Sequence, residues 1–172
     1  MKMGYPLFIL GSAAIVALDQ VTKWVVVKSV PLYESFPIVD GVLSLCHVRN
    51  RGIAFGFLNR AGSQVTFYLL TFVTLAAVAL VVFWFSRLKA EGKGGTALGL
   101  CLILGGAVGN LIDRIRIGEV VDFLDFHLGA YHWPAFNVAD SAITVGTLWL
   151  ALKILFPGRG EGQRAAGGER KG

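Results

Sequence analysis

The feature that most constrains the fold is the uncharged stretch VTFYLLTFVTLAAVALVVFWF, residues 65–85. A helix needs about 20 consecutive apolar residues to cross the hydrocarbon core of a bilayer, and this stretch meets that length. Three further apolar runs lie at about residues 7–27, 96–113 and 141–156. The sequence therefore predicts an all-α membrane protein with four transmembrane helices.

The composition supports lipid as the solvent. The 172 residues are 55% hydrophobic and only 16% charged, with a mean hydropathy of +0.64, whereas soluble domains are roughly a quarter charged. The net charge is +5, but the basic residues lie between and after the apolar runs and not in a patch, so no nucleic-acid partner is expected. Residues 1–157 form one membrane-embedded domain in this interpretation. The Gly-rich, charged residues 158–172 are expected to be a disordered cytoplasmic tail.

The segments between the spans divide into two kinds. Residues 29–64 contain Pro31, Pro37 and Gly41 and then VLSLCHV, whose mixed alternation indicates a short half-buried strand. This segment is expected to form a small β-rich structure outside the membrane. The segment between Asp122 and Asp140 is expected to loop out and return. The N-terminal run is interpreted as a retained first helix and not as a cleaved signal peptide.

The distribution of lysine and arginine predicts the topology. With four spans, both termini and the 87–95 loop lie on one side, and this side holds more of the basic residues. By the positive-inside rule, both termini are expected in the cytoplasm. The 28–64 and 114–138 segments would then face outward together.

Small residues and cysteines carry weaker signals. Gly105 and Gly109 form a G-x-x-x-G pattern, which favours close helix packing; a backbone left open for a substrate is the other interpretation. Cys46 and Cys101 are expected to be free. No His and Cys spacing typical of a metal site appears, so neither a metal nor a cofactor is expected.

Polar residues gather at the outer ends of the predicted spans. Asp19 and Lys23 lie four residues apart on one helix face and are expected to form a structural ion pair. Asn110 and Asp113 lie three residues apart and share a face, with Arg114 next to them. Taken alone, this second group is typical of a helix end that meets water.

Asp122 and Asp140 also have ordinary interpretations when each is taken alone. Asp122 would be an exposed loop acid, Asp140 the N-cap of the last helix, and Asn50 a turn residue. Together, Asp122 and Asp140 indicate acid–base catalysis. Two nearby carboxyl groups cannot both ionise, so one acts as base and the other as acid. Such a pair activates water against a peptide carbonyl. Asp140, beside a helix N-terminus, is expected to be the ionised member, and Asp113 is not excluded from the pair.

Five motifs, DQVTK, NRGIAF, GGAVGNLIDR, VVDF and FNVAD, resemble in order and spacing those of lipoprotein signal peptidase, or signal peptidase II. The resemblance covers residues 19–143. It implies an aspartic endopeptidase of the bacterial inner membrane, with four helices and a small extracytoplasmic β-cradle. Such an enzyme would cleave the signal peptide from diacylglyceryl-modified prolipoproteins immediately before the lipidated cysteine. The implied partners are this substrate, membrane lipid and globomycin-type inhibitors.

The resemblance also implies roles for individual residues. The catalytic pair falls on Asp122 and Asp140, and Asp113 matches a position that the family also needs. The polar residues implied to line the substrate site are Asn50, Asn110, Asp113, Arg114 and Asn137. Two other functions compete: a small proton-coupled transporter that uses intramembrane acids, and a non-catalytic membrane scaffold whose polar residues only cap helices.

Overall fold

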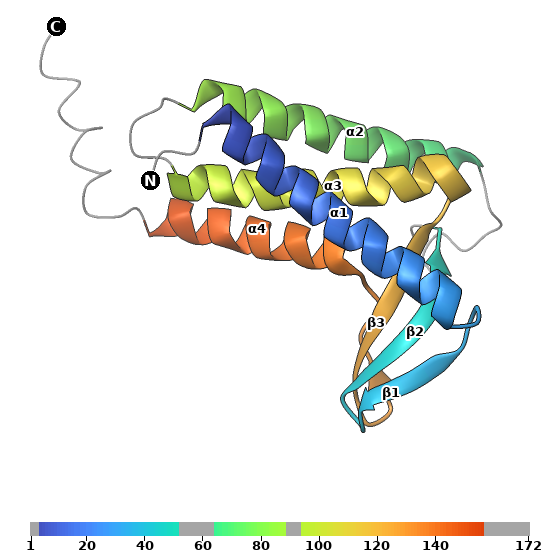
Figure 1. The fold of residues 1–172 in the computed structure, drawn as a ribbon. Coiled ribbons are helices and arrows are strands. Elements are labelled where there is room, and N and C mark those ends of the chain that lie inside the picture. The colour runs from blue at the N-terminus through green and yellow to red at the C-terminus, as the bar shows by residue number, and fades with distance from the viewer. Residues whose placement is uncertain (1–3, 52–63, 89–93, 157–172) are drawn as a thin grey trace, which may run out of the picture.

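The computed structural model describes residues 4–51, 64–88 and 94–156. Four helices in these ranges are long and apolar enough to cross a membrane: α1 (Tyr5–Ser29), α2 (Gln64–Arg87), α3 (Gly94–Ile117) and α4 (Val138–Leu155). Figure 1 shows them packed as one bundle, with a small sheet at one end. The predicted fold is confirmed. The predicted tail, residues 158–172, lies outside the described residues.

The helices extend beyond the apolar runs that predicted them. Helix α3 continues past Asn110 to Ile117, and α4 begins at Val138, three residues before the apolar run. Polar residues can occupy these turns because other side chains form hydrogen bonds and ion pairs with them, as described below. Hydropathy detects the apolar part of a helix and misses such turns.

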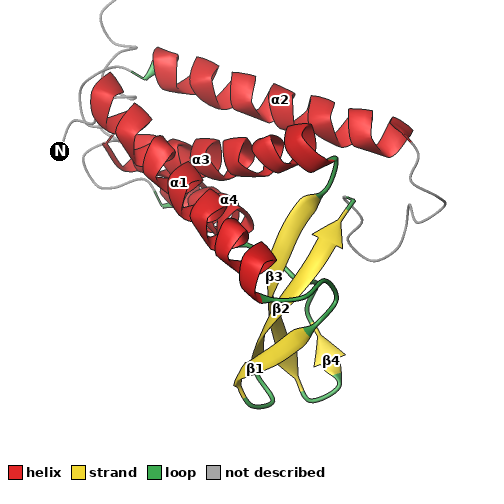
Figure 2. Cartoon of the chain, turned by 45° about the vertical axis from the view of Figure 1, so that its right-hand side comes forward, coloured by secondary structure: helices red, strands yellow, loops and turns green. Residues whose placement is uncertain are grey.

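The sheet has four antiparallel strands in the order β1-β2-β3-β4. The first two, β1 (Ser35–Val39) and β2 (Leu43–Asn50), lie in the predicted β-rich segment. The other two, β3 (Val120–Leu128) and β4 (Tyr131–His132), follow α3. The segment between Asp122 and Asp140 does leave the bundle and return, and it does so as β3 and β4, strands that were not predicted. Two distant segments build one sheet, in which β2 pairs with β3 (Figure 2).

Tight connections allow the chain to turn from α3 into the sheet and back. Gly118 has a φ of +74° between α3 and β3, and Gly129 has a φ of +59° between β3 and β4. Glycine adopts this left-handed region without the steric cost of a Cβ atom. These turns direct β3 back along β2.

Helix α3 lies at the centre of the bundle and contacts the other three helices. A Cβ atom at Gly105 would lie 2.6 Å from Ile15 Cβ, so the glycine lets α1 approach closely. The close-packing interpretation of the G-x-x-x-G pattern is thus confirmed.

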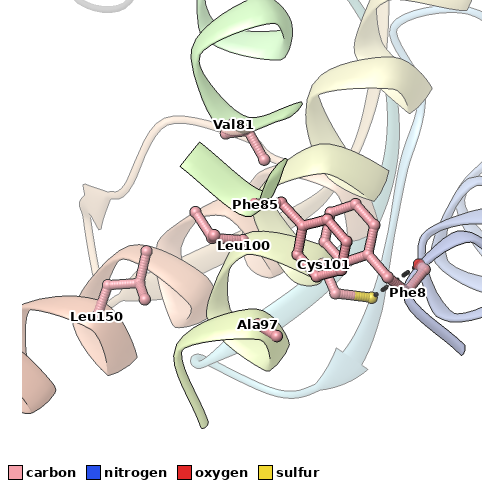
Figure 3. Close-up of a cluster of buried hydrophobic side chains, with 7 residues drawn as sticks. All are labelled: Phe8, Val81, Phe85, Ala97, Leu100, Cys101 and Leu150. Atoms are coloured by element: carbon pink, nitrogen blue, oxygen red, sulfur yellow. Dashed lines mark hydrogen bonds between the residues drawn. The ribbon is translucent and has the colours of Figure 1, made fainter. Parts of the chain in front are cut away.

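Two apolar clusters hold the bundle and the sheet in place. At the end far from the sheet, Phe8 stacks on Phe85 with ring centroids 3.7 Å apart, around the fully buried Leu100 (Figure 3). At the other end, Phe123 of β3 packs against Val26 of α1. The second cluster fixes β3 beside the last turns of α1, and thereby fixes Asp122.

Candidate active site

Asp122 lies in β3, where only 2% of its surface is exposed. The interpretation of Asp122 as an exposed loop acid is therefore wrong. Its Oδ2 accepts a hydrogen bond from Asn50 Nδ2 at 2.9 Å, and its Oδ1 accepts one from Asn137 Nδ2 at 2.7 Å. Asn50 ends β2, the strand that pairs with β3, so the sheet brings the amide to the acid.

Burial raises the pKa of Asp122 to about 7, and the negative charge of Asp140 contributes in the same direction. The hydrogen bonds from Asn50 and Asn137 and the charge of Lys23 lower the pKa but do not cancel the effect of burial. A carboxyl group with this pKa is substantially protonated at neutral pH. It can therefore act as an acid.

Asp140 occupies the first turn of α4 and is half-buried. The N-cap of the helix is Asn137, whose Oδ1 accepts a hydrogen bond from the Asp140 backbone N–H at 2.9 Å. The interpretation of Asp140 itself as the N-cap is therefore wrong. Its carboxylate lies where the helix dipole favours a negative charge, and its Oδ1 accepts a hydrogen bond from Asn110 Nδ2 at 2.8 Å.

Two asparagines connect the acids. Asn137 is fully buried, and besides Asp122 its Nδ2 donates to the Val121 carbonyl at 3.2 Å and to Asn110 Oδ1 at 3.3 Å. Asn110 in turn donates to Asp140. A continuous chain of hydrogen bonds therefore joins Asp122 to Asp140 through amide groups of α3 and the α4 N-cap.

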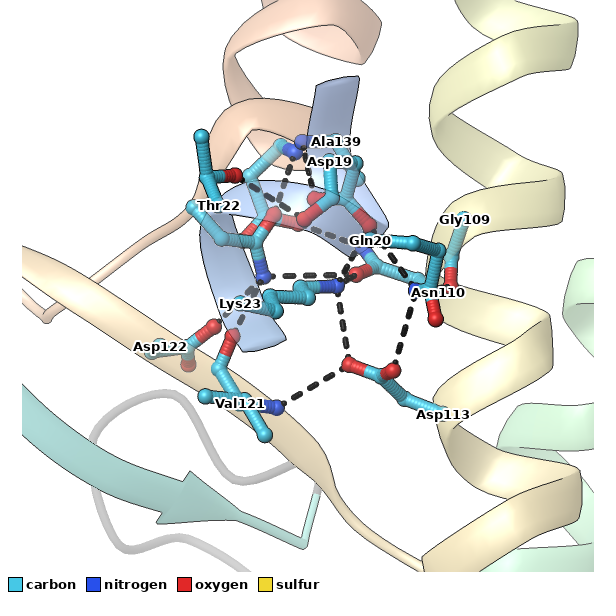
Figure 4. A network of polar contacts seen from close by, with 12 residues as sticks. Asp19, Gln20, Thr22, Lys23, Gly109, Asn110, Asp113, Val121, Asp122 and Ala139 are labelled. Atoms are coloured by element: carbon cyan, nitrogen blue, oxygen red, sulfur yellow. Dashed lines mark hydrogen bonds and ion pairs between the residues drawn. The ribbon is translucent and has the colours of Figure 1, made fainter. Parts of the chain in front are cut away.

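A buried charged cluster lies beside this chain (Figure 4). Lys23 Nζ lies 2.8 Å from Asp19 Oδ2, which confirms the predicted ion pair, and 2.9 Å from Asp113 Oδ2. Asp19 Oδ1 accepts a hydrogen bond from the Ala139 backbone N–H at 2.9 Å. The cluster therefore ties α1 to α3 and to the first turn of α4.

Asp113 is placed differently from the two acids of the candidate pair. Its Oδ1 accepts from Gln20 Nε2 at 3.0 Å, and its Oδ2 accepts from the Val121 N–H at 3.2 Å as well as from Lys23. Its geometry is that of a group that holds Lys23 and the start of β3 together.

Arg114 reaches toward α2 from α3. Its Nη1 lies 3.4 Å from Thr74 Oγ1 and 3.4 Å from the Asn110 carbonyl oxygen. These contacts are long and leave most of the five N–H donors of a guanidinium group to other partners. Arg114 is the residue of the site best suited to bind a carbonyl or phosphate oxygen.

Sequence reasoning missed two contributors to the site. Gln20 donates to Asp19, Asp113 and the Gly109 carbonyl; it lies within DQVTK, so the motif held the signal. Gly109 leaves room for an acid, since a Cβ atom there would lie 2.7 Å from Asp19 Oδ2. The G-x-x-x-G pattern indicated helix packing but not space for a carboxylate.

The cysteines lie apart from this chemistry. Both are free and buried. Burial, with the negative charges of Asp125 and Asp122, raises the pKa of the Cys46 thiol to about 11, so Cys46 is a poor nucleophile. Cys101 belongs to the apolar cluster at the opposite end of the bundle. In the described ranges, no group of three or more His, Cys, Asp or Glu residues could hold a metal ion.

Comparison with known proteins agrees with this geometry. A family model described as "Signal peptidase (SPase) II" matches residues 12–156. The lipoprotein signal peptidase of Desulforapulum autotrophicum is 48% identical over 145 residues, covering 84% of this chain and 89% of the relative. That of Nitratidesulfovibrio vulgaris is 50% identical over 139 residues, covering 80% and 83%.

Two solved structures share the fold. One is a bacterial membrane enzyme determined by the in meso method at 2.3 Å resolution, which is 31% identical with a TM-score of 0.77 and 90% of each chain covered. A second, at 1.9 Å resolution, is 28% identical with a TM-score of 0.79, covering 91% of this chain and 97% of the other. The family model covers most of α1, the other three helices and the sheet, and relatives close to half identical match most of the length of this chain. The chain therefore belongs to the signal peptidase II family.

Proposed function

We propose that this membrane protein is a lipoprotein signal peptidase that works as an aspartic endopeptidase. Its substrates are diacylglyceryl-modified prolipoproteins, cleaved immediately before the lipidated cysteine. Family membership supports the substrate class. The observation that carries the aspartic mechanism is the pair Asp122 and Asp140, joined by the hydrogen bonds of Asn137 and Asn110.

In the proposed reaction, Asp140 is the base and Asp122 the acid. Asp140 takes a proton from a water molecule as the water oxygen bonds to the scissile carbonyl carbon. Asp122 gives its proton to the leaving nitrogen as the C–N bond breaks. The pKa of about 7 for Asp122 supports the assignment, although the shared proton belongs to the pair.

The other polar residues have distinct proposed roles. Asn110 and Asn137 hold the two acids, and Asn50 holds Asp122. Arg114 positions carbonyl or ester oxygens of the substrate with its planar fork of donors. Asp113 supports the site through Lys23. In this mechanism no step needs a metal or cofactor.

The proposed location is the bacterial inner membrane, with both termini cytoplasmic and the sheet on the extracytoplasmic side. The basic residues around the helix ends far from the sheet support this orientation. Reporter proteins fused after residue 90 and at the C-terminus are expected to report the cytoplasm. A periplasmic signal from either fusion would contradict the topology.

The test of function is cleavage of a diacylated prolipoprotein by the purified protein in detergent or lipid, with and without globomycin. We expect release of the signal peptide, inhibition by globomycin and no cleavage of the same precursor without its diacylglyceryl group. Arg114→Lys keeps the charge and loses the fork, so it should cleave more slowly. Cleavage that does not require the diacylglyceryl group and is not inhibited by globomycin would contradict the proposal.

A proton-coupled transporter is less well supported. Intramembrane acids in a transporter lie within the helices near the middle of the bilayer. Asp122 lies on a strand beyond the helices, and Asp140 lies in the first turn of α4. Both acids are thus at the sheet end of the bundle, where a peptide bond at the membrane surface would be accessible.

A further inference from the structure

The ammonium group of Lys23 has three contacts, and none of them is to Asp122 or Asp140. Besides Asp19 and Asp113, its Nζ donates to Asn110 Oδ1 at 2.9 Å (Figure 4). An ammonium group has three N–H donors and no acceptor. These contacts use all three donors, so each N–H of Lys23 has an oxygen partner and the position of the ammonium group is fixed.

The contact to Asn110 determines which way the Asn110 amide points. Its Oδ1 accepts from Lys23 and Asn137, and its Nδ2 donates to Asp140. Turning the amide by half a turn would place its NH₂ group against the ammonium and its oxygen against the Asp140 carboxylate. Both contacts would be repulsive, because two donors or two acceptors would face each other. The cation therefore allows one orientation only.

We infer that Lys23 is a positioning residue for cleavage: by fixing the Asn110 side chain, it holds the Asp140 carboxylate in the place where it accepts a proton. The inference rests on the proposed function of the acid pair. It adds a second role to the Asp19–Lys23 ion pair, which by itself would only join one turn of α1. The route from Lys23 to the carboxylate has two steps, of 2.9 Å and 2.8 Å.

The charge of Lys23 acts on the other acid as well. Burial chiefly raises the pKa of Asp122, and Lys23 is among the groups that lower it. Loss of the cation should therefore raise that pKa further, so that Asp122 keeps its proton to higher pH. A reaction that needs protonated Asp122 would then continue to higher pH.

The test is a double-mutant cycle measured as kcat/KM for cleavage of a diacylated prolipoprotein. Lys23→Met and Asn110→Ala are made singly and together. If Lys23 acts through Asn110, the double variant loses about as much rate as Asn110→Ala alone, because no amide remains to be oriented. We expect the loss in Lys23→Met to appear in kcat and to leave KM nearly unchanged.

The pH profile gives a second measurement. In the wild type, the rate should fall as the pH rises through about 7, where Asp122 loses its proton. In Lys23→Met this fall should move to higher pH. Independent, multiplying losses in the cycle would overturn the inference whatever the pH profile, because the charge of Lys23 acts on Asp122 without passing through Asn110.

A folding control is needed, because Lys23→Met leaves Asp19 and Asp113 buried without their cation, which is strongly destabilising. The cycle is therefore repeated with Asp19→Asn, which together with Lys23→Met restores the wild-type net charge of the cluster. The amide oxygen that replaces the carboxylate in Asp19→Asn can still accept from the Ala139 N–H.

Wild-type protein that cleaves no substrate contradicts the proposed function and the inference with it. If the wild-type protein is active but the rate losses of Lys23→Met and Asn110→Ala multiply in the double variant, the inference alone is contradicted.

Discussion

Replacing Asp122 or Asp140 by Asn is expected to reduce cleavage of a diacylated prolipoprotein by about 10²–10⁴-fold or more, the usual contribution of general acid–base catalysis. Asn keeps the size of the side chain and removes the group that exchanges a proton. Both variants should fold, because neutralising one member of a buried acid pair removes repulsion. Binding of globomycin and thermal unfolding measure the fold separately from the rate.

The matched control is Asp125→Asn on the same strand. Asp125 pairs with His132 at 2.9 Å near the far end of β3, away from Asp140. This variant should cleave at nearly the wild-type rate. The decisive comparison is with Asp113→Asn, since Asp113 was not excluded by sequence. If Asp122→Asn kept full activity while folded Asp113→Asn lost it, the pair would be Asp113 with Asp140.

Gly106→Ala is expected to lower both stability and activity. A Cβ atom at this position would lie 2.8 Å from Ile143 Cγ1 and closer still to the Ala139 carbonyl oxygen. The carbonyl is backbone, so α3 and the first turn of α4 must move apart. Overpacking of this kind typically costs about 1–3 kcal/mol. The shift also displaces Asp140, and a displacement near 1 Å can reduce a rate by about 10²-fold.

Gly95→Ala is the control for this substitution. A Cβ atom at Gly95 would approach Lys153 Cε at 2.8 Å, but this is the end of a flexible side chain that can move away. Alanine also has the higher helix propensity. Thermal unfolding and cleavage rate should therefore stay close to wild type. Wild-type values for both quantities in Gly106→Ala would show that α3 and α4 are not in tight contact beside the site.

Hydropathy alone predicted the four helices, because crossing a bilayer imposes a minimum apolar length. It could not predict the ends of the helices nearest the site. In α3 the sequence turns polar at Asn110, but the helix continues to Ile117, because Lys23 and Gln20 of α1 form an ion pair and a hydrogen bond with Asp113. Such support comes from residues about 90 positions away, which no local pattern reveals.

The sheet shows the same limit. Strand β2 was recognisable from its alternation, whereas no strand was predicted where β3 lies. The first four residues of β3, Val120–Phe123, are all buried. The alternation of apolar and polar residues that identifies a strand with one solvent-exposed face is therefore missing there. The pairing of Asn50 with Val120 joins segments separated by two helices. The motifs named the residues of the candidate site but not the direction in which each amide donates.

The order of the elements along the chain has a consequence for biosynthesis. Strand β2 lies between the first two helices, β3 follows the third, and Asp140 belongs to the last. A nascent chain that has inserted three helices carries Asp122 but lacks Asp140, the N-cap Asn137 that donates to Asp122, and the Ala139 backbone N–H that donates to Asp19. The two acids of the proposed pair thus come together only when the final helix enters the bilayer. If Asp122 and Asp140 are the catalytic pair, as proposed above, the chain cannot cleave peptides by this mechanism until α4 is in place.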